Sequence, residues 1–266
     1  MEAKEIITNY YNNYDEDGRL ISKHGQVEFL TTMRYIEKYV NCDSRILEIG
    51  TGTGRYSHTL AQNGYTVDAI DLVPHNIEIF QSKMAPGEKI SICQGDARDL
   101  SAFSDNTYDI TLLLGPLYHM FTTEDKKQTI REALRVTKPG GVVFAAYCMS
   151  DASIIDAGFK RSLIVIPDLI EKGFINPETF ETRSAPELIF EIVRKEQIDK
   201  IMQDFLVSRL HFVATDLYTN HMREVIDEMN DETYKLYLRY HFTICERPDM
   251  IGFTHHSLDV FRKDRG

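Results

Sequence analysis

A glycine-rich turn between an apolar run and a helical pattern constrains the fold of this chain more than any other feature. The run RILEI occupies residues 45–49, the turn GTGTG occupies residues 50–54, and a helical pattern begins near Tyr56. Glycine permits backbone conformations and close approaches that a Cβ would prevent. The order of strand, glycine turn and helix predicts a parallel α/β unit whose turn offers backbone N–H groups to a ligand.

The alternation of strand and helix continues to about residue 149. Pro74 marks the start of one helix, and Thr122 with Asp125 marks the start of another. We predict an α/β fold with a doubly wound, mostly parallel sheet and right-handed crossovers, because its apolar runs are continuous rather than alternating. The further runs lie at residues 65–70 (YTVDAI), 89–93 (KISIC), 108–114 (YDITLLL) and 142–147 (VVFAAY).

The remaining segments predict additions to a core domain at residues 41–149. Residues 1–40 are expected to form an N-terminal helical lid, and residues 150–207 a helical cap insertion. Residues 208–266 contain two strand-like runs, which we expect to complete a seven-stranded sheet with an antiparallel edge strand. The helices expected in the cap lie near residues 153–159, 186–193 and 196–205, with prolines or glycines before the second.

The charge balance weighs against partners that present a phosphate backbone. The chain has 30 Lys and Arg residues against 41 Asp and Glu residues, a formal net charge of −11, and its sequence contains no basic stripe. We therefore expect no nucleic acid partner. No apolar run reaches the ~20 residues of a membrane span, and the first residues lack the apolar part of a signal peptide. These features predict a cytoplasmic protein with no membrane partner.

Three acidic residues lie where predicted strands end at one edge of the sheet. At the end of the second strand, Asp71 is placed to accept hydrogen bonds from both hydroxyls of a ribose; alternatively, it caps the helix that begins at Pro74. Glu48 precedes the glycine turn, where its charge repels a pyrophosphate and suits an ammonium group. Asp96 follows the third strand and is placed to bind an adenine amino group. Together they predict a ligand with adenine, ribose and a cationic amino-acid tail.

Five motifs occur in an order that resembles the class I, Rossmann-like S-adenosylmethionine-dependent methyltransferases. They are LEIGTGTG, VDAIDL, GDARDL, YDITLLLGPLYHM and VTKPGGVV, and they cover roughly residues 41–149. The resemblance implies that S-adenosyl-L-methionine (SAM) is the cofactor. The flanking segments are similar to the small-molecule branch that carries a helical cap, which implies a small-molecule methyl acceptor.

The resemblance also implies a role for the residues of these motifs. The glycine turn and the segment after the fourth strand would lie along the methionine part of SAM, with Glu48 near its amino group. Asp71 would hold the ribose, and the residues that follow the second and third strands would contact the adenine. The implied cofactor-binding residues are Glu48, Gly50, Thr51, Gly52, Gly54, Asp71, Leu72, Asp96, Ala97, Leu114 and Gly115.

The candidates for catalysis and for covering the cofactor lie outside the glycine turn. His119 is a candidate general base, needed only if the acceptor keeps its proton, and Tyr118 stands beside it. The alternatives are a structural histidine and a packing tyrosine. Tyr11, with Tyr10 and Tyr14, is expected to cover the cofactor as part of a lid, as N-terminal segments do in similar enzymes; the alternative is packing of an amphipathic helix.

Two other functions share part of this pattern. A NAD-dependent oxidoreductase would also use the glycine turn and Asp71, but Glu48 and Asp96 disfavour it. A non-catalytic SAM-binding protein is the second alternative. The sequence LGPLY at residues 114–118 departs from the Asn/Asp-Pro-Pro-aromatic motif of amino-methylating DNA enzymes, and the acidic ligands of metal-dependent relatives are missing there, so we predict no metal. The acceptor atom and the oligomeric state stay open.

Overall fold

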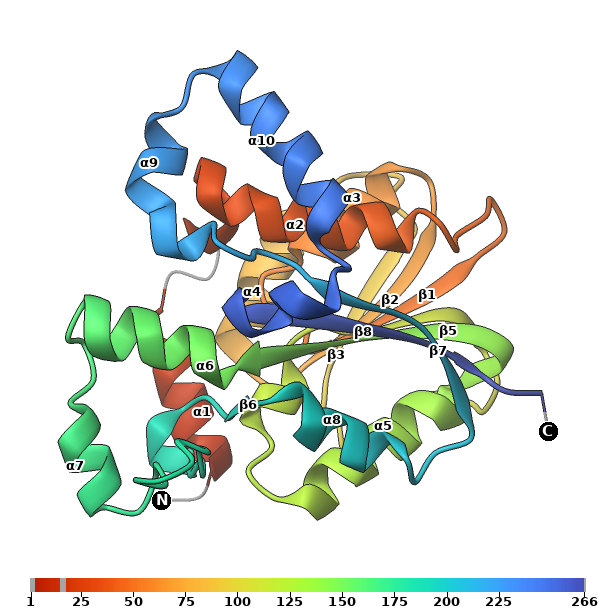
Figure 1. Ribbon diagram of the computed structural model, residues 1–266. Helices are drawn as coiled ribbons and strands as arrows, with labels where there is room; N and C mark the ends of the chain where they lie inside the picture. Colours follow the sequence, from red (N-terminus) through yellow and green to blue (C-terminus); the bar gives the residue numbers. More distant parts are fainter. Residues whose placement is uncertain (1–2, 15–17, 266) are drawn as a thin grey trace.

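An eight-stranded sheet forms the centre of the computed structural model, which describes residues 3–14 and 18–265 (Figure 1). Its strands are β1 Arg45–Ile49, β2 Thr66–Asp71, β3 Ile90–Gln94, β4 Tyr108–Leu113, β5 Thr137–Met149, β6 Ile192–Val193, β7 Val207–Ala214 and β8 His256–Lys263. They are ordered β3-β2-β1-β4-β5-β8-β7, and β6 pairs with the end of β5. Strands β1 to β6 are parallel, whereas β8 is antiparallel to both β5 and β7.

This topology confirms the doubly wound, mostly parallel fold with an antiparallel edge. The sheet has one strand more than the seven predicted, because the short β6 pairs with Cys148 and Met149 of β5. The two strand-like runs in the last part of the chain become β7 and β8, as expected. Residues 138–141 were not expected to be part of a strand, but they form an irregular stretch within β5, where the register with β4 shifts.

Helices cover both faces of the sheet. They are α1 Ala3–Tyr11, α2 Lys23–Ile36, α3 Arg55–Gln62, α4 Pro74–Ser82, α5 Thr123–Val136, α6 Ser150–Ser153, α7 Ile166–Glu171, α8 Lys195–Met202, α9 Arg223–Glu228 and α10 Asp231–Ile244. In Figure 1, α2, α3 and α10 lie above the sheet, and α5 and α8 lie below it. Short 3₁₀ or π-helical segments are η1 Gly18–Leu20, η2 Pro116–His119, η3 Ile154–Lys160, η4 Pro186–Leu188, η5 Asn220–Met222 and η6 Pro248–Phe253.

Local sequence signals explain where the core helices begin. The Thr122 hydroxyl accepts a hydrogen bond from the N–H of Asp125 at 3.1 Å and so caps α5, as its spacing predicted. Pro74 occupies the first turn of α4, where its missing N–H removes no helical bond. The strands between these helices are buried on both faces: Ile46, Leu112 and Phe144 are fully buried, and each such side chain contributes roughly 1.5–3 kcal/mol.

The cap departs from its prediction in two places. A helix was expected over residues 186–193, but only η4 is helical there, and the chain then extends into β6. Pro167 was expected to separate helices, yet it lies in the first turn of α7. Both errors arise because segments this short are shaped by contacts with distant parts of the chain, such as the pairing of β6 with β5, rather than by local pattern.

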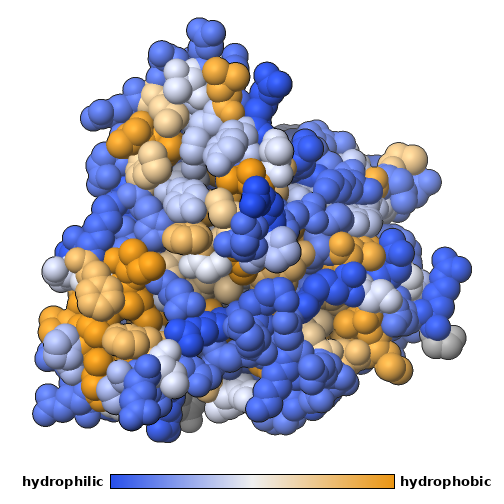
Figure 2. All heavy atoms as spheres, in the orientation of Figure 1, coloured by the Kyte–Doolittle hydropathy of each residue, from blue (hydrophilic) through white to orange (hydrophobic). Residues whose placement is uncertain are grey.

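The surface carries apolar side chains on the cap. Figure 2 shows them gathered at the lower left, over the part of Figure 1 that contains α6 and α7. The exposed members on the cap include Ile155, Phe159, Leu163 and Val165. Within residues 3–14 and 18–265, no helix has both the length and the apolar composition required to cross a bilayer.

A buried carboxylate between β7 and β8 gives a test of the fold. Asp216 accepts hydrogen bonds from the Thr254 hydroxyl and from the backbone N–H of His255, and its other oxygen accepts one from the His256 ring at 2.7 Å. We expect Asp216→Ala to lower the free energy of unfolding by about 3–5 kcal/mol, because it removes the nearer of the two carboxylates beside His256 and leaves several buried donors unpaired. Urea unfolding measures this change.

The control for this variant is Asp249→Ala. Asp249 forms an ion pair with Arg247 at 2.7 Å, but both side chains are largely exposed. An exposed pair contributes little to stability, so the free energy of unfolding should stay almost unchanged. Equal losses in the two variants would contradict the role given to the buried network of Asp216.

Candidate functional site

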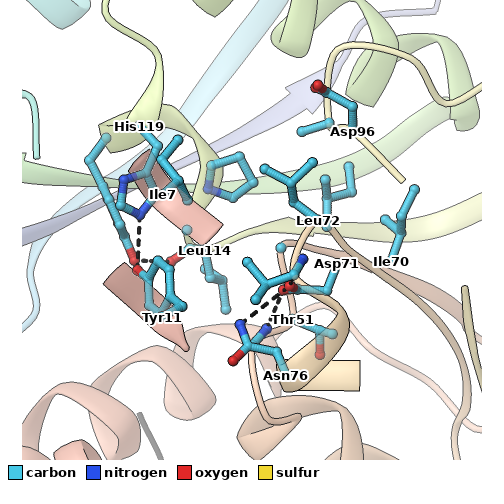
Figure 3. Close-up of a pocket in the computed structure, with 18 of the residues that line it drawn as sticks. Ile7, Tyr11, Thr51, Ile70, Asp71, Leu72, Asn76, Asp96, Leu114 and His119 are labelled. Atoms are coloured by element: carbon cyan, nitrogen blue, oxygen red, sulfur yellow. Dashed lines mark hydrogen bonds between the residues drawn. The ribbon is translucent and has the colours of Figure 1, made fainter. Parts of the chain in front are cut away.

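A pocket opens where β1, β2 and β4 end, and α1 covers part of it (Figure 3). Of the residues predicted to form the site, the pocket brings together Tyr11, Glu48, Gly50, Thr51, Gly52, Asp71, Leu72, Asp96, Ala97, Leu114, Gly115, Tyr118 and His119. These residues come from segments more than a hundred positions apart in the chain. The edge of the sheet assembles them, because the carboxyl ends of its parallel strands lie side by side.

One residue of the predicted site, Gly54, is not part of the pocket lining. It precedes α3 with a φ of 88°, and a Cβ there would overlap the ring of Phe80. Gly54 therefore allows α3 and α4 to pack closely. Gly50 lines the pocket with a φ of 71°, and its Cβ would lie 2.6 Å from the ring of Pro116. Glycine is required at both positions by the backbone conformation and by the neighbouring ring.

Glu48 is buried beneath the turn. Its carboxylate accepts hydrogen bonds from the Thr51 hydroxyl at 3.0 Å and from the Ser57 hydroxyl. Burial raises the pKa of Glu48 to about 7, although the two hydroxyls act in the opposite direction. Glu48 is thus a lining carboxylate whose charge depends on pH near neutrality. The contribution of Ser57, on the first turns of α3, was missed, because a serine inside a helix carries no signal of its own in the sequence.

Asp71 holds the other side of the turn. One carboxylate oxygen accepts a hydrogen bond from the Gly52 N–H at 2.7 Å, and the other accepts one from the Val73 N–H at 2.8 Å. The side chain of Asn76 also donates to Asp71, at 3.3 Å, and the two side chains point toward each other in Figure 3. Asn76 lines the pocket and was not predicted. Asp71 therefore supports the backbone before α4 and also presents a carboxylate at the pocket.

Asp96 lies at the far end of the pocket, next to a cation that the sequence analysis did not single out. The guanidinium of Arg98 donates to both carboxylate oxygens of Asp96, at 3.0 and 2.7 Å, and it also donates to Asp125 at 3.1 Å. Burial acts to raise the pKa of Asp96, but hydrogen bonds from Arg98 outweigh it, so the pKa lies below its usual range. Asp96 is consequently ionised at neutral pH.

Tyr118 and His119 lie at the other end, on η2 after β4. The Tyr118 hydroxyl donates to the carbonyl of Leu114 at 3.2 Å. The two ring nitrogens of His119 lie 2.9 Å from the Tyr11 hydroxyl and 2.9 Å from the Ile189 carbonyl. Burial lowers the pKa of His119 to about 4, so its ring is neutral at physiological pH. The contact with Ile189 was not predicted.

The three tyrosines of the N-terminal segment contact one another, and they reach two different parts of the molecule. Tyr11 lines the pocket and faces His119, as Figure 3 shows. Tyr10 stacks on Tyr14 with ring centroids 5.1 Å apart and also contacts the edge of Phe190 from the cap. Helix α1 therefore contacts both the pocket and the cap, and the lid stays a prediction.

Two groups of possible metal ligands occur among the described residues, and neither lies in the pocket lining. They are Asp156, His221 and His255, and Glu28, Asp216 and His256. Asp156 is already paired with Arg161 at 3.0 Å and Arg223 at 3.1 Å, and these positive charges oppose a divalent cation.

Comparisons with known proteins agree with this geometry. Residues 46–141 match the model of a methyltransferase domain family. Over 138 residues the chain is 29% identical to a putative methyltransferase, YqeM, from Bacillus subtilis, covering 52% of this chain and 53% of that protein. A demethylmenaquinone methyltransferase from Clavibacter sepedonicus is 27% identical over 63% of this chain and 67% of its own length. The chain thus spans between half and two thirds of the length of these relatives.

Solved structures extend the similarity to almost the whole fold. A SAM-dependent methyltransferase from Methanosarcina mazei has a TM-score of 0.58 and 21% identity, covering 87% of this chain and 98% of that one. A protein from Pyrococcus horikoshii has a TM-score of 0.62 and 15% identity, covering 96% and 99%. The chain therefore contains a methyltransferase domain at residues 46–141, and its fold is similar to that of a solved SAM-dependent methyltransferase. The family predicted from the five motifs is confirmed, and the methyltransferase domain coincides with the strands that build the pocket.

The pKa of Glu48 gives a test of whether this residue binds a cationic ligand in the pocket. S-adenosylhomocysteine (SAH) carries the same ammonium group as SAM. If Glu48 contacts that ammonium group, it attracts it only as a carboxylate, so we expect SAH affinity to be highest just above pH 7 and to fall below it, by up to about tenfold per pH unit. Glu48→Gln should weaken SAH binding by about tenfold to a hundredfold at pH 8 and remove the pH dependence. Calorimetric titration at several pH values measures both effects.

The matched control is Glu224→Gln on α9, an exposed residue outside the pocket lining. It should bind SAH like the unmodified protein at every pH. If Glu48→Gln kept the same pH dependence as that control, another group would be responsible and the ammonium contact would be wrong.

Proposed function

We propose that this protein binds SAM in the pocket and transfers its methyl group to a small-molecule acceptor by in-line displacement. The observation that carries the proposal is the distribution of charge along the pocket. The pocket is lined by the carboxylates of Glu48, Asp71 and Asp96. Between them lies a backbone turn in which Gly50 leaves no room for a Cβ. This arrangement suits a ligand that carries an ammonium, a sulfonium and a ribose. The lining also contains the cations Lys4, Arg55 and Arg98, of which Arg98 is paired with Asp96 and Asp125.

The geometry supports one orientation of the cofactor. Glu48 would bind the ammonium group, and the carboxylate of Asp71, which also accepts hydrogen bonds from Gly52 and Val73, would bind the ribose hydroxyls. Asp96 and the backbone of Ala97 would bind the adenine, with Leu72 against its face. The methionine tail would then follow Gly50, Thr51 and Gly52 toward Leu114 and Gly115, which places the sulfonium methyl near the end that holds His119.

Methyl transfer needs orientation more than covalent chemistry from the protein. Holding two reactants in line can lower the barrier by roughly 7–11 kcal/mol. Helix α1 contributes by covering the pocket with Ile7 and Tyr11 and so excluding water from the sulfonium. When bound, SAM supplies the methyl group and the thioether leaving group; the chain holds the acceptor on the far side of the methyl carbon.

The acceptor end of the pocket is bounded by the cap, through the contacts of Ile189 and Phe190 with His119. This supports the cap as the segment that selects the acceptor. The names of relatives, which include demethylmenaquinone and ubiquinone biosynthesis methyltransferases, favour a small molecule. The net charge of −11 weighs against nucleic acid as the methyl acceptor. The location that we propose for the protein is the cytoplasm.

Binding of SAH and of NAD to the same protein distinguishes this proposal from its rivals. We expect SAH to bind and NAD to bind much more weakly, and Asp71→Asn to weaken SAH by about tenfold through loss of a charged acceptor. Asp249→Asn, an exposed control, should not change either affinity. Thermal unfolding checks that Asp71→Asn remains folded, since Asp71 also holds the turn.

The outcomes of this experiment separate the three functions. Preference for NAD would contradict the proposal and favour the oxidoreductase. Tight SAH binding without methylation in a broad screen of small acceptors would favour the non-catalytic SAM-binding protein. Methylation of an acceptor with release of SAH supports the methyltransferase.

A further inference from the structure

A second cavity lies on the face of the sheet that α5 and α8 cover, at the end of β5. Its volume is about 480 Å³, within the roughly 300–1,000 Å³ of sites that bind small molecules. Among the described residues, Tyr118 of η2 is the one that lines both this cavity and the pocket. The cavity is therefore a separate space on the other side of Tyr118, which the proposed methyl transfer does not use.

Ion pairs balance the charges that line this cavity. Its lining holds three lysines and three carboxylates. The Nζ of Lys126 on α5 lies 2.6 Å from one carboxylate oxygen of Glu191 and 2.5 Å from the other, and the two side chains are only 9% and 13% exposed. Nearer to solvent, Lys127 is paired with Asp204 at 2.5 Å. A charged ligand would have to compete with these pairs, and a buried charge that loses its partner destabilises the protein.

One buried polar group of the cavity has no partner. Tyr147 on β5 lines the cavity and is 4% exposed, and its hydroxyl forms no hydrogen bond with the residues that the structure describes. Burial raises the pKa of Tyr147 well above its usual value, so the hydroxyl keeps its hydrogen. The carboxylate of Asp259, which also raises this pKa, accepts its hydrogen bonds from Arg209, at 2.8 and 2.7 Å. The phenol therefore has one hydrogen to donate and no acceptor for it.

Apolar side chains form the inner part of the cavity wall. Leu117 of η2, Val193 of β6 and Ile198 of α8 line the cavity and are buried in the hydrophobic core. They would cover the carbon skeleton of a ligand and remove it from water. Sites for small molecules typically combine such apolar walls with a few polar groups that fix the orientation of the ligand. In this cavity the hydroxyl of Tyr147 is such a group.

We propose that the cavity binds a neutral ketone or amide with an apolar body, whose carbonyl oxygen accepts a hydrogen bond from Tyr147. Three observations carry the proposal: the unused donor, the charges that are already paired with one another, and the buried apolar wall. A neutral ligand satisfies the donor and leaves the pair of Lys126 and Glu191 intact. The proposal does not depend on methyl transfer, because Tyr147 and these pairs lie outside the pocket lining.

The test uses two probes of almost the same shape, acetophenone and isopropylbenzene, which differ in the carbonyl oxygen. We expect acetophenone to bind saturably at about millimolar concentration, which is reasonable for so small a molecule. Methyl NMR of the whole chain, with labelled Ile, Leu and Val, locates the probe. The signals of Val193, Ile198 and Ile201 should shift, whereas those of Leu72 and Leu114 in the pocket should not.

The variant Tyr147→Phe removes the hydroxyl and keeps the ring. It should weaken acetophenone binding by about tenfold and change isopropylbenzene binding by less than about twofold, because only the ketone loses a hydrogen bond. The matched control is Tyr240→Phe, on an exposed part of α10, which should bind both probes like the unmodified protein. Benzoate and benzylamine, two charged probes of similar size, should bind at least about tenfold more weakly than acetophenone.

Thermal unfolding gives a readout that needs no ligand. A hydroxyl without a partner does not stabilise the folded state, so Tyr147→Phe should unfold at the same temperature as the unmodified protein or at a higher one. A hydroxyl that was bonded within the protein would behave differently, because its loss would lower the unfolding temperature by several degrees. That result would remove the unused donor and with it the proposal.

The other contrary results also overturn the proposal. They are the absence of saturable acetophenone binding, and shifts confined to the methyl signals of the pocket. An equal effect of Tyr147→Phe on the two probes would show that only the apolar wall is used. Tighter binding of benzoate or benzylamine than of acetophenone would contradict a neutral ligand. None of these results bears on the proposed methyl transfer, which the binding of SAH tests separately.

Discussion

The turn after β1 is the constraint on which the site depends, and buried carboxylates hold it from two sides. Glu48 binds the hydroxyl of Thr51 from below, and Asp71 binds the N–H of Gly52 from the neighbouring strand. The backbone between them can therefore lie open to a ligand without losing its shape. The carboxylates that fix the turn also line the pocket. The same two side chains therefore determine both the shape of the turn and the electrostatic field in the pocket.

Burial gives these carboxylates different properties. Glu48 is almost fully buried among neutral hydroxyls, which raises its pKa toward neutrality, whereas Asp96 has Arg98 beside it and stays ionised. A cationic group should therefore be attracted most strongly by ionised Glu48, because burial lowers the local dielectric constant around that carboxylate. At the far end, Arg98 already neutralises part of the charge, so Asp96 serves better as a directional acceptor for a neutral amino group than as a partner for a cation.

The parallel sheet and most of the cofactor end could be predicted from the sequence because their signals are local. A buried strand, a glycine turn and a helix start are each contained in a few consecutive residues, and parallel strands place their ends together. Arg98 could have been found from the sequence, because it follows Asp96 by two residues. Ser57 and Asn76 were missed because each is an ordinary polar residue on a helix, and only the folded chain brings it to a carboxylate. The β6 strand escaped prediction for a similar reason, since two residues pair with β5 without any pattern of their own.

The end of the pocket at His119 depends on contacts between distant segments, whereas the end at the glycine turn depends on short local motifs. His119 could be identified from its distance along the chain to Gly115, but its partners Tyr11 and Ile189 come from segments 108 and 70 residues away. The protonation state of the ring is set by those partners and by burial, none of which follows from neighbouring residues. The part of the pocket formed by the glycine turn and the strand ends can therefore be specified by short sequence motifs. In the proposed reaction, the choice of acceptor would depend on how the N-terminal helix and the cap meet at His119, so it could change while the sheet beneath remains the same.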